Sequence, residues 1–218
     1  MVQLARRIIR HPRWTIVGVK QVLVRHSKEQ GFAVEAYPDF LTGPRDAVAS
    51  ALGLPSERVE EAMQSDWWPD GAAWGAGSEL MQALRAIILL RSPETVVEAG
   101  VAAGVSSAVI LKAMAENGRG ELHSIDLPLL GKDEEVGKLV PDQLRDRWSL
   151  RLGPASDLLS PLLEEVGPVD LFLHDADHAY GSQLREYRVA WPHLKSGGVL
   201  LSDDVDNPAF VHLSLIHI

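Results

Sequence analysis

Residues 95–107 have the sequence TVVEAGVAAGVSS, which changes from strand-like to helix-like across two glycines. The segment begins with β-branched residues, which favour a strand, and then places Gly100 and Gly104 four positions apart. A turn of this kind brings backbone N–H groups at a helix N-terminus close to a nucleotide-like ligand. A dinucleotide-binding fingerprint would need a further glycine at position 102, where this chain has Ala102. The loop alone therefore indicates a nucleotide-like ligand without specifying which one.

On both sides of this loop, strand-like and helix-like segments alternate. Short apolar runs indicate buried strands, and apolar residues repeating every three or four positions indicate helices. We predict strands at residues 95–98, 121–126, 149–152, 169–175 and 198–203. We predict helices at residues 78–91, 106–117, 137–148, 156–166 and 181–194. This alternation predicts an α/β fold with a doubly wound, mostly parallel sheet that is covered by helices on both faces.

Asp126 ends the second predicted strand, 22 residues beyond Gly104. A carboxylate in this place can accept hydrogen bonds from both ribose hydroxyls of a bound nucleoside. An acid at the end of a strand is also a common cap. Its combination with the glycine loop favours the ribose role.

The glycine loop and this acid resemble the class I S-adenosylmethionine-dependent methyltransferases. Glu98, Gly100 and Gly104 fill an acid-x-Gly-x-x-x-Gly pattern similar to the first motif of that family, and Asp126 matches its ribose acid. The resemblance implies a Rossmann-like methyltransferase fold with S-adenosylmethionine as the cofactor. The cofactor-binding residues that it implies are Glu98, Gly100, Gly104, Ser106, Asp126 and Asp175.

Within that class, the chain is most similar to the metal-dependent O-methyltransferases, both the catechol and caffeoyl-CoA type and the macrocin and sugar type. The similarity is carried by LFLHDADHAY at residues 171–180 and LKSGGVLLSDDV at residues 194–205. It implies a small-molecule hydroxyl acceptor such as a sugar, a catechol or a macrolide.

Four carboxylates follow two neighbouring predicted strands: Asp175 and Asp177 after one, and Asp203 and Asp204 after the next. Because ligands bind outside the carboxyl ends of parallel strands, these acids should face the same opening as the glycine loop. They would repel one another unless protonated or bridged by a cation. With no cysteine in the chain, oxygen ligands favour Mg²⁺, with Mn²⁺ or Ca²⁺ as alternatives. The resemblance implies Asp175, Asp203 and Asp204 as metal ligands; the alternative is that the acids cap turns and helices.

His178 lies three residues beyond Asp175 and is the predicted general base. Its imidazole titrates near neutrality and could take a proton from a metal-bound hydroxyl, a step that water could also perform. The activated sulfonium donor would need no enzyme nucleophile. The alternative is an ordinary surface histidine, whereas His174 is expected to be packed in the core.

One stretch departs from the family pattern. Between the third strand and its helix the family often has Gly-Asp-Ala or Gly-Asp-Ser, which contacts adenine, but residues 153–157 of this chain are GPASD. Pro154 cannot make that contact, so Ser156 or Asp157 would have to replace it.

The N-terminal residues 1–77 are predicted to form a basic and helical extension. Residues 1–28 hold seven Lys or Arg and no acid, although the whole chain has a net charge of −9. This basic start could pack on the acidic body or a second subunit, which we favour, or bind an anionic membrane or nucleic acid. No nucleic-acid-binding motif accompanies it. Trp67, Trp68 and Trp74 are expected to seal a hydrophobic seam, or alternatively to line the acceptor site.

The chain has 218 residues, of which 46% are hydrophobic and 23% charged, typical of a globular protein. It contains no apolar run long enough to span a bilayer and no signal peptide, so a cytoplasmic protein is expected. We expect the methyltransferase domain at residues 78–212 to lack its last two strands, and residues 213–218 to be non-native. The fifth strand would then be a bare edge that promotes poor solubility or dimerisation.

Two other functions share parts of this pattern. An NAD(P)-dependent oxidoreductase has the same strand–glycine–helix start, but it needs the glycine missing at position 102 and has no use for the acid cluster. A hydroxylase-like or non-catalytic relative could keep the acids on the same fold.

Overall fold

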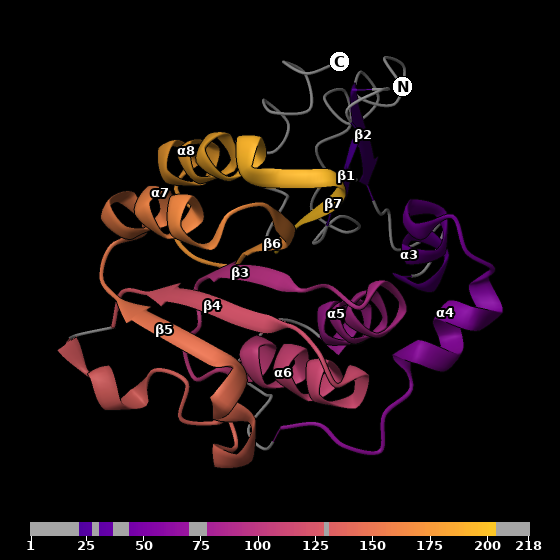
Figure 1. Ribbon diagram of the computed structural model, residues 1–218, viewed down its shortest axis with the longest axis horizontal. Coiled ribbons are helices and arrows are strands. Elements are labelled where there is room, and N and C mark those ends of the chain that lie inside the picture. Colours follow the sequence, from indigo (N-terminus) through magenta and orange to yellow (C-terminus); the bar gives the residue numbers. More distant parts are fainter. Residues whose placement is uncertain (1–21, 28–30, 37–43, 70–77, 129–130, 204–218) are drawn as a thin grey trace, which may run out of the picture.

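The computed structural model describes residues 22–27, 31–36, 44–69, 78–128 and 131–203. Its described strands form one sheet in the order β2-β1-β7-β6-β3-β4-β5 (Figure 1). Five of them are parallel neighbours: β3 (Thr95–Ala99), β4 (Glu121–Asp126), β5 (Trp148–Leu152), β6 (Val169–His174) and β7 (Leu194–Ser202). The predicted doubly wound parallel sheet is therefore confirmed.

Helices cover both faces of this sheet (Figure 1). On one face lie α5 (Ser78–Arg91) and α6 (Val105–Asn117), with α3 (Pro44–Leu52) and α4 (Ser56–Met63) outside α5. On the other face lie α7 (Ala155–Val166) and α8 (Tyr180–Ala190). Successive side chains of a strand point to opposite faces, so Val96 packs with α5 and α6 while Val97 packs with α7 and α8.

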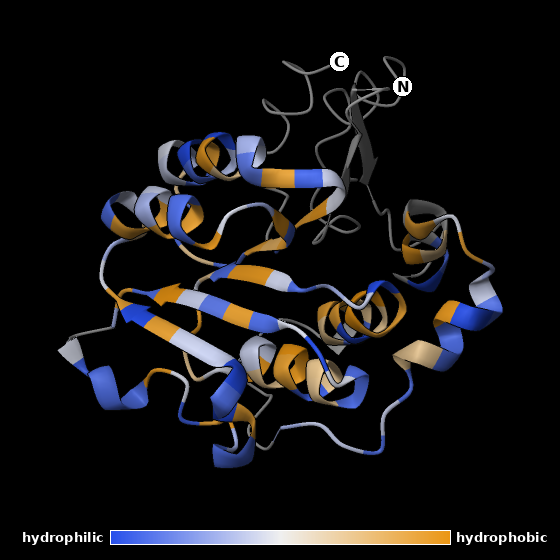
Figure 2. Ribbon diagram, viewed as in Figure 1, coloured by the Kyte–Doolittle hydropathy of each residue, from blue (hydrophilic) through white to orange (hydrophobic). Residues whose placement is uncertain are grey.

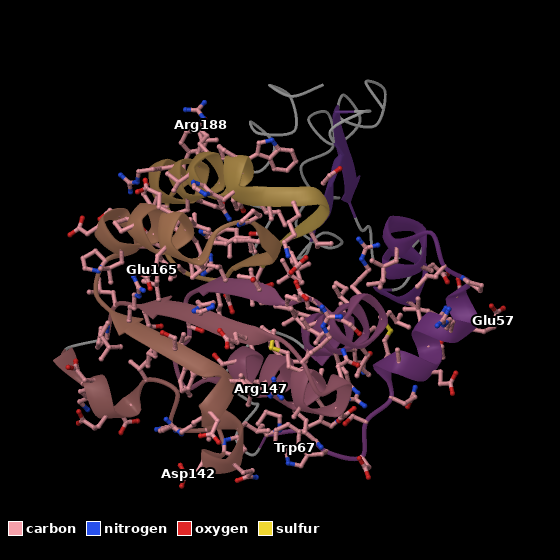
Figure 3. All side chains as sticks on the ribbon, viewed as in Figure 1. Glu57, Trp67, Asp142, Arg147, Glu165 and Arg188 are labelled. Carbon is pink, nitrogen blue, oxygen red and sulfur yellow. The ribbon has the colours of Figure 1, made fainter. Side chains whose placement is uncertain are left out.

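The two cores are built from the apolar runs of the sequence. Strand β3 has four consecutive buried residues, as expected for a central parallel strand. Figure 2 shows apolar residues along the central strands and on α5 and α6, whereas hydrophilic residues occupy much of the crossover between β4 and β5. Trp67, labelled in Figure 3, is partly buried against the core on the α5 side, in agreement with the seam interpretation. Trp68 is more exposed, and Trp74 lies outside the described residues.

The described residues of the N-terminal extension form both helices and strands. Helices α3 and α4 confirm the predicted helical part, but β1 (Val22–Ser27) and β2 (Gly31–Ala36) form an antiparallel hairpin. Strand β1 also pairs antiparallel with β7, with Val22 opposite Ser202. The expected bare edge at β7 is therefore wrong, because β1, which contains the β-branched Val22 and Val24, takes this edge. The poor solubility or dimerisation expected of the chain stays a prediction.

The segment predicted as a helix at residues 137–148 is not an α-helix. It contains the 3₁₀ helix η4 (Asp142–Arg147), preceded by η3 (Asp133–Glu135). Gly137 has a positive φ of 68°, and Pro141 immediately precedes η4, so a continuous α-helix cannot pass through both positions. The predicted helix at residues 181–194 is α8 followed by η5 (Trp191–His193), and β7 starts four residues earlier than predicted.

No helix among the described residues combines the length and the apolar character needed to cross a membrane. Asp204 and residues 213–218 lie outside the described residues. The interpretations placed on them stay predictions.

Candidate active site at the carboxyl ends of the strands

A cavity of about 770 Å³ opens at the carboxyl ends of the parallel strands, where ligands bind in open α/β sheets. Its walls come from the glycine loop, the ends of β4 and β6, the start of α7, the first turns of α8 and the β4–β5 crossover. The lining residues used below are Gly100, Ala102, Asp126, Leu127, Pro154 and Asp175. A volume of this size suits a cofactor together with a small acceptor.

The glycine loop is shaped by close backbone contacts. A Cβ added at Gly100 would lie 1.9 Å from the carbonyl oxygen of Asp175, and Gly100 has a φ of 93°. Only glycine fits there, because both the space and the backbone conformation exclude a side chain. Ala102, at the position without glycine, also has a positive φ, of 46°, a conformation that costs an alanine about 1–2 kcal/mol.

Asp126 holds this strained loop and faces the cavity. Its Oδ2 accepts hydrogen bonds from the backbone N–H groups of Val101, at 2.6 Å, and Ala102, at 2.8 Å. No described residue donates a hydrogen bond to its Oδ1. The carboxylate therefore orders the loop with one oxygen, and its other oxygen accepts no hydrogen bond from the described residues.

Glu98 lies behind the loop and is completely buried. Its carboxylate accepts hydrogen bonds from the hydroxyls of Ser106, Ser107 and Ser124, at 2.6 to 2.7 Å. Burial raises the pKa of Glu98, although the three serine hydrogen bonds oppose that change. Glu98, Gly104 and Ser106 are not among the residues that line the cavity. Their direct contact with a cofactor stays a prediction, while their role in shaping the loop is visible.

The start of α7 presents backbone donors to the cavity, which Pro154, Ala155 and Ser156 line. The first four N–H groups of a helix have no partner within the helix. The N–H groups of Asp157 and Leu158 donate to the carbonyl oxygen of Pro154. The N–H groups of Ala155 and Ser156 have no acceptor among the described residues. The Ser156 hydroxyl instead bonds to Asp157, at 2.9 Å. Nearby Leu127 is 65% exposed and forms an apolar wall.

The acids that follow β6 and β7 are brought together by strand pairing. His174 pairs with Ser202, and the N–H of Asp203 donates to the carbonyl oxygen of His174, at 3.0 Å. Asp175 and Asp203 therefore leave adjacent strands side by side, as predicted. Across the described residues, however, no three His, Asp or Glu side chains are grouped closely enough to hold a metal ion, and Asp204 is outside them.

Asp177 and His178 lie in the turn between β6 and α8, and both are exposed. Asp177 accepts hydrogen bonds from the N–H of Ala179, at 3.0 Å, and from the Ser182 hydroxyl, which lower the pKa of its carboxyl group. Asp177 thus caps the turn that precedes α8, as in the alternative interpretation. His178 is not among the cavity-lining residues, so its role as a base stays a prediction.

A family model described as "Methyltransferase domain" matches residues 97–205. This chain belongs to that methyltransferase family. The matched segment runs from the middle of β3 to just beyond β7, so it includes the glycine loop, Asp126 and both acid turns. Among curated proteins, no sequence matches the chain.

Solved methyltransferase structures share the fold. An O-methyltransferase from Bacillus cereus, in complex with SAH, is 18% identical with a TM-score of 0.53, over 76% of this chain and 74% of that one. TomG from Streptomyces achromogenes, an O-methyltransferase involved in tomaymycin synthesis, in complex with SAM, is 19% identical with a TM-score of 0.52, over 80% and 77%. SAH-bound PaMTH1 from Podospora anserina is 19% identical with a TM-score of 0.51, over 71% of this chain and 62% of its own length. At these identities the likeness shows the fold alone.

Sequence reasoning missed a buried polar cluster behind the acids of this methyltransferase. His174 is completely buried, as expected, and its Nε2 lies 3.1 Å from Oε2 of the buried Glu186. Gln183 beside them on α8 is also fully buried. The Tyr187 hydroxyl and Ser202 Oγ are 2.6 Å apart, and burial raises the pKa of Tyr187 well above its usual value. The sequence signal for this cluster was the helical spacing of Gln183, Glu186 and Tyr187, which places these polar side chains on one face of α8.

Proposed function

We propose that this protein is an S-adenosylmethionine-dependent O-methyltransferase that moves a methyl group to a hydroxyl of a small molecule. The observation that carries the proposal is Asp126, which ends β4, lines the cavity and binds the glycine loop through Oδ2, with no hydrogen-bond donor to its Oδ1 among the described residues. Its place beside the loop matches the ribose-binding acid of nucleoside cofactors. Membership of the methyltransferase family and the SAM- or SAH-bound neighbours favour the sulfonium cofactor over a dinucleotide.

The described residues fit such a cofactor along the whole cavity. Asp126 would bind the ribose hydroxyls, and the backbone of the glycine loop beside Asp175 would contact the methionine part. Leu127 offers an apolar surface for a flat base. The N–H groups of Ala155 and Ser156 would donate hydrogen bonds to ring nitrogens of adenine. The backbone at the start of α7 would then make the adenine contact that Pro154 cannot make.

When bound, S-adenosylmethionine supplies a methyl group on a positively charged sulfur, so the protein needs no nucleophile of its own. The protein would bind and orient the two reactants. The glycine loop and Asp126 would hold the methyl donor, and the cavity would align the acceptor oxygen with the carbon–sulfur bond. Such positioning can supply much of the rate acceleration. His178, in the turn after Asp175, is the proposed base for the hydroxyl proton.

The proposal also includes a divalent metal ion that would orient the acceptor oxygen. Oxygen ligands without thiolates suit Mg²⁺, and Asp175 and Asp203 lie on adjacent strand ends. These two supply only part of a ligand set within the described residues, and Asp204 would be the third.

Transfer of a labelled methyl group from S-adenosylmethionine tests this function, with sugars, catechols and macrolides as acceptors. We expect transfer to at least one hydroxyl acceptor and none to its O-methylated counterpart. Loss of transfer in EDTA, with recovery on adding Mg²⁺, would support the metal, whereas unchanged transfer in EDTA would remove it from the proposal. Oxidation of an alcohol with NAD(P) and no methyl transfer would overturn the function itself.

A further inference from the structure

The crossover between β4 and β5 runs along the outside of the glycine loop and bonds to its backbone. The N–H of Gly137 donates to the carbonyl oxygen of Ala102, at 2.8 Å, and the N–H of Leu139 donates to that of Ala103, at 2.9 Å. These bonds hold the carbonyl groups of Ala102 and Ala103. Asp126 holds the same loop from its amide side, because it accepts hydrogen bonds from the N–H groups of Val101 and Ala102. The strained Ala102 is therefore restrained from two directions.

Two glycines allow this close approach. A Cβ on Gly137 would lie 2.1 Å from Cη2 of Trp148, and a Cβ on Gly104 would lie 2.8 Å from the Cα of Gly137. Gly137 thus fits between the loop and the Trp148 ring, where no larger residue can be placed without displacing one of them.

Arg145 fastens the crossover in this position. Its Nη2 donates to the carbonyl oxygen of Gly137, at 2.9 Å, and its Nε donates to that of Val140, at 3.2 Å. Its guanidinium carbon lies 5.4 Å from the centre of the Trp148 ring, within the range of a cation–π contact. One side chain therefore binds the turn around Gly137 and the aromatic ring behind it.

Trp148 connects this arrangement to the buried acid behind the loop. Its indole N–H donates to Ser124 Oγ, at 2.9 Å, and Ser124 donates in turn to Glu98, at 2.7 Å. Glu98 also binds the two serines at the start of α6. The loop is consequently held by one continuous network from its outer and inner sides.

The same crossover forms part of the cavity wall through Lys132, Glu135, Val136 and Lys138. We propose that Gly137, Arg145 and Trp148 form a clamp that keeps residues 100–104 in the cofactor-binding conformation, so that the crossover sets the affinity for S-adenosylmethionine. This inference rests on the proposed function. The three residues are positioning residues, since they act through the loop and none of them lines the cavity.

The matched variants Arg145→Gln and Arg147→Gln test the clamp. Both arginines belong to η4 and both donate to two backbone carbonyls, but Arg147, labelled in Figure 3, binds Gly118 and Gly120 at the end of α6. Arg145→Gln should weaken S-adenosylhomocysteine binding in calorimetry about tenfold, which corresponds to about 1.4 kcal/mol. Arg147→Gln should leave the affinity unchanged.

Amide hydrogen exchange supplies a readout that does not need the cofactor. Exchange across residues 100–104 should be faster in Arg145→Gln and unchanged in Arg147→Gln. Trp148→Phe, which removes the indole N–H and also part of the ring that packs against Gly137, should show faster exchange as well. Equal effects of the two arginine variants, or unchanged affinity and exchange in Arg145→Gln, would overturn the clamp. If the wild type binds no S-adenosylhomocysteine, the proposed function fails, and the exchange comparison still decides for or against the clamp.

Discussion

The two ends of the cavity differ in how the polar groups at or behind them are partnered. At the glycine loop, Glu98 receives hydrogen bonds from three serine hydroxyls and Asp126 binds two backbone amides. Behind the acids, Gln183 is just as buried, but neither of its amide atoms has a hydrogen-bond partner among the described residues. We conclude that the loop end is ordered by the protein itself. Substitutions there should change folding and cofactor binding together, whereas substitution of Gln183, which does not line the cavity, should change stability alone.

The largest effect is expected for Gly100→Ala. The added Cβ would lie 1.9 Å from the Asp175 carbonyl oxygen, so either the loop or the end of β6 must move. We expect no measurable S-adenosylhomocysteine binding in calorimetry and a clearly lower melting temperature. The control is Gly118→Ala, which has a similarly positive φ but no heavy atom within 4 Å of its Cβ; it should cost only about 1–2 kcal/mol and leave binding intact. Equal losses of binding in both variants would contradict the account.

Asp126→Asn should have the next largest effect. The amide keeps one oxygen for the loop but loses the charge that strengthens hydrogen bonds to ribose hydroxyls. Bonds to charged groups contribute about 1.5–3 kcal/mol, so affinity should fall roughly 10- to 100-fold. Ultraviolet cross-linking of labelled S-adenosylmethionine, titrated against unlabelled ligand, measures the change. Wild-type affinity in this variant would remove Asp126 from the ribose site.

Gln183→Met tests the buried amide at the other end of the cavity. Removing a buried amide without hydrogen-bond partners relieves a desolvation cost of about 1–3 kcal/mol, and methionine has a similar length. We therefore expect a higher free energy of unfolding in urea and unchanged S-adenosylhomocysteine affinity. A lower free energy of unfolding would show that the amide is hydrogen-bonded in solution, and the two ends of the cavity would then be alike.

The smallest effect concerns pH and Glu98. Burial raises the pKa of this carboxyl group above its ordinary value of 4.5. The folded protein therefore holds the proton more tightly than the unfolded chain, and the stability from this group is fully present below pH 4.5 and is lost as pH rises through the folded-state pKa. Urea unfolding of wild type and Glu98→Gln across this pH range should show the wild type losing stability relative to the variant. A difference that does not change with pH would contradict the raised pKa.

Local patterns were sufficient to predict the central part of the fold. The strand, glycine loop and helix around Gly100 lie within one continuous segment, and Asp126 follows at the end of the next strand. Their geometry depends on near neighbours and on the general rule that parallel strands present their carboxyl ends together.

The missed features depend on contacts between distant segments. Apolar residues in the β4–β5 crossover suggested a helix, but Gly137 and Pro141 interrupt it, and the segment bonds instead to Ala102 and Ala103. The pairing of β1 with β7 joins residues near opposite ends of the described chain. Likewise, the helical spacing of polar residues in α8 did not show that Glu186 would meet His174 of β6.

Calorimetric titration of the wild-type protein with S-adenosylhomocysteine and, separately, with NAD⁺ tests whether this cavity binds the methyl-donor cofactor. We expect one saturable site for S-adenosylhomocysteine and no heat of binding for NAD⁺. Binding of NAD⁺ without binding of S-adenosylhomocysteine would contradict this expectation.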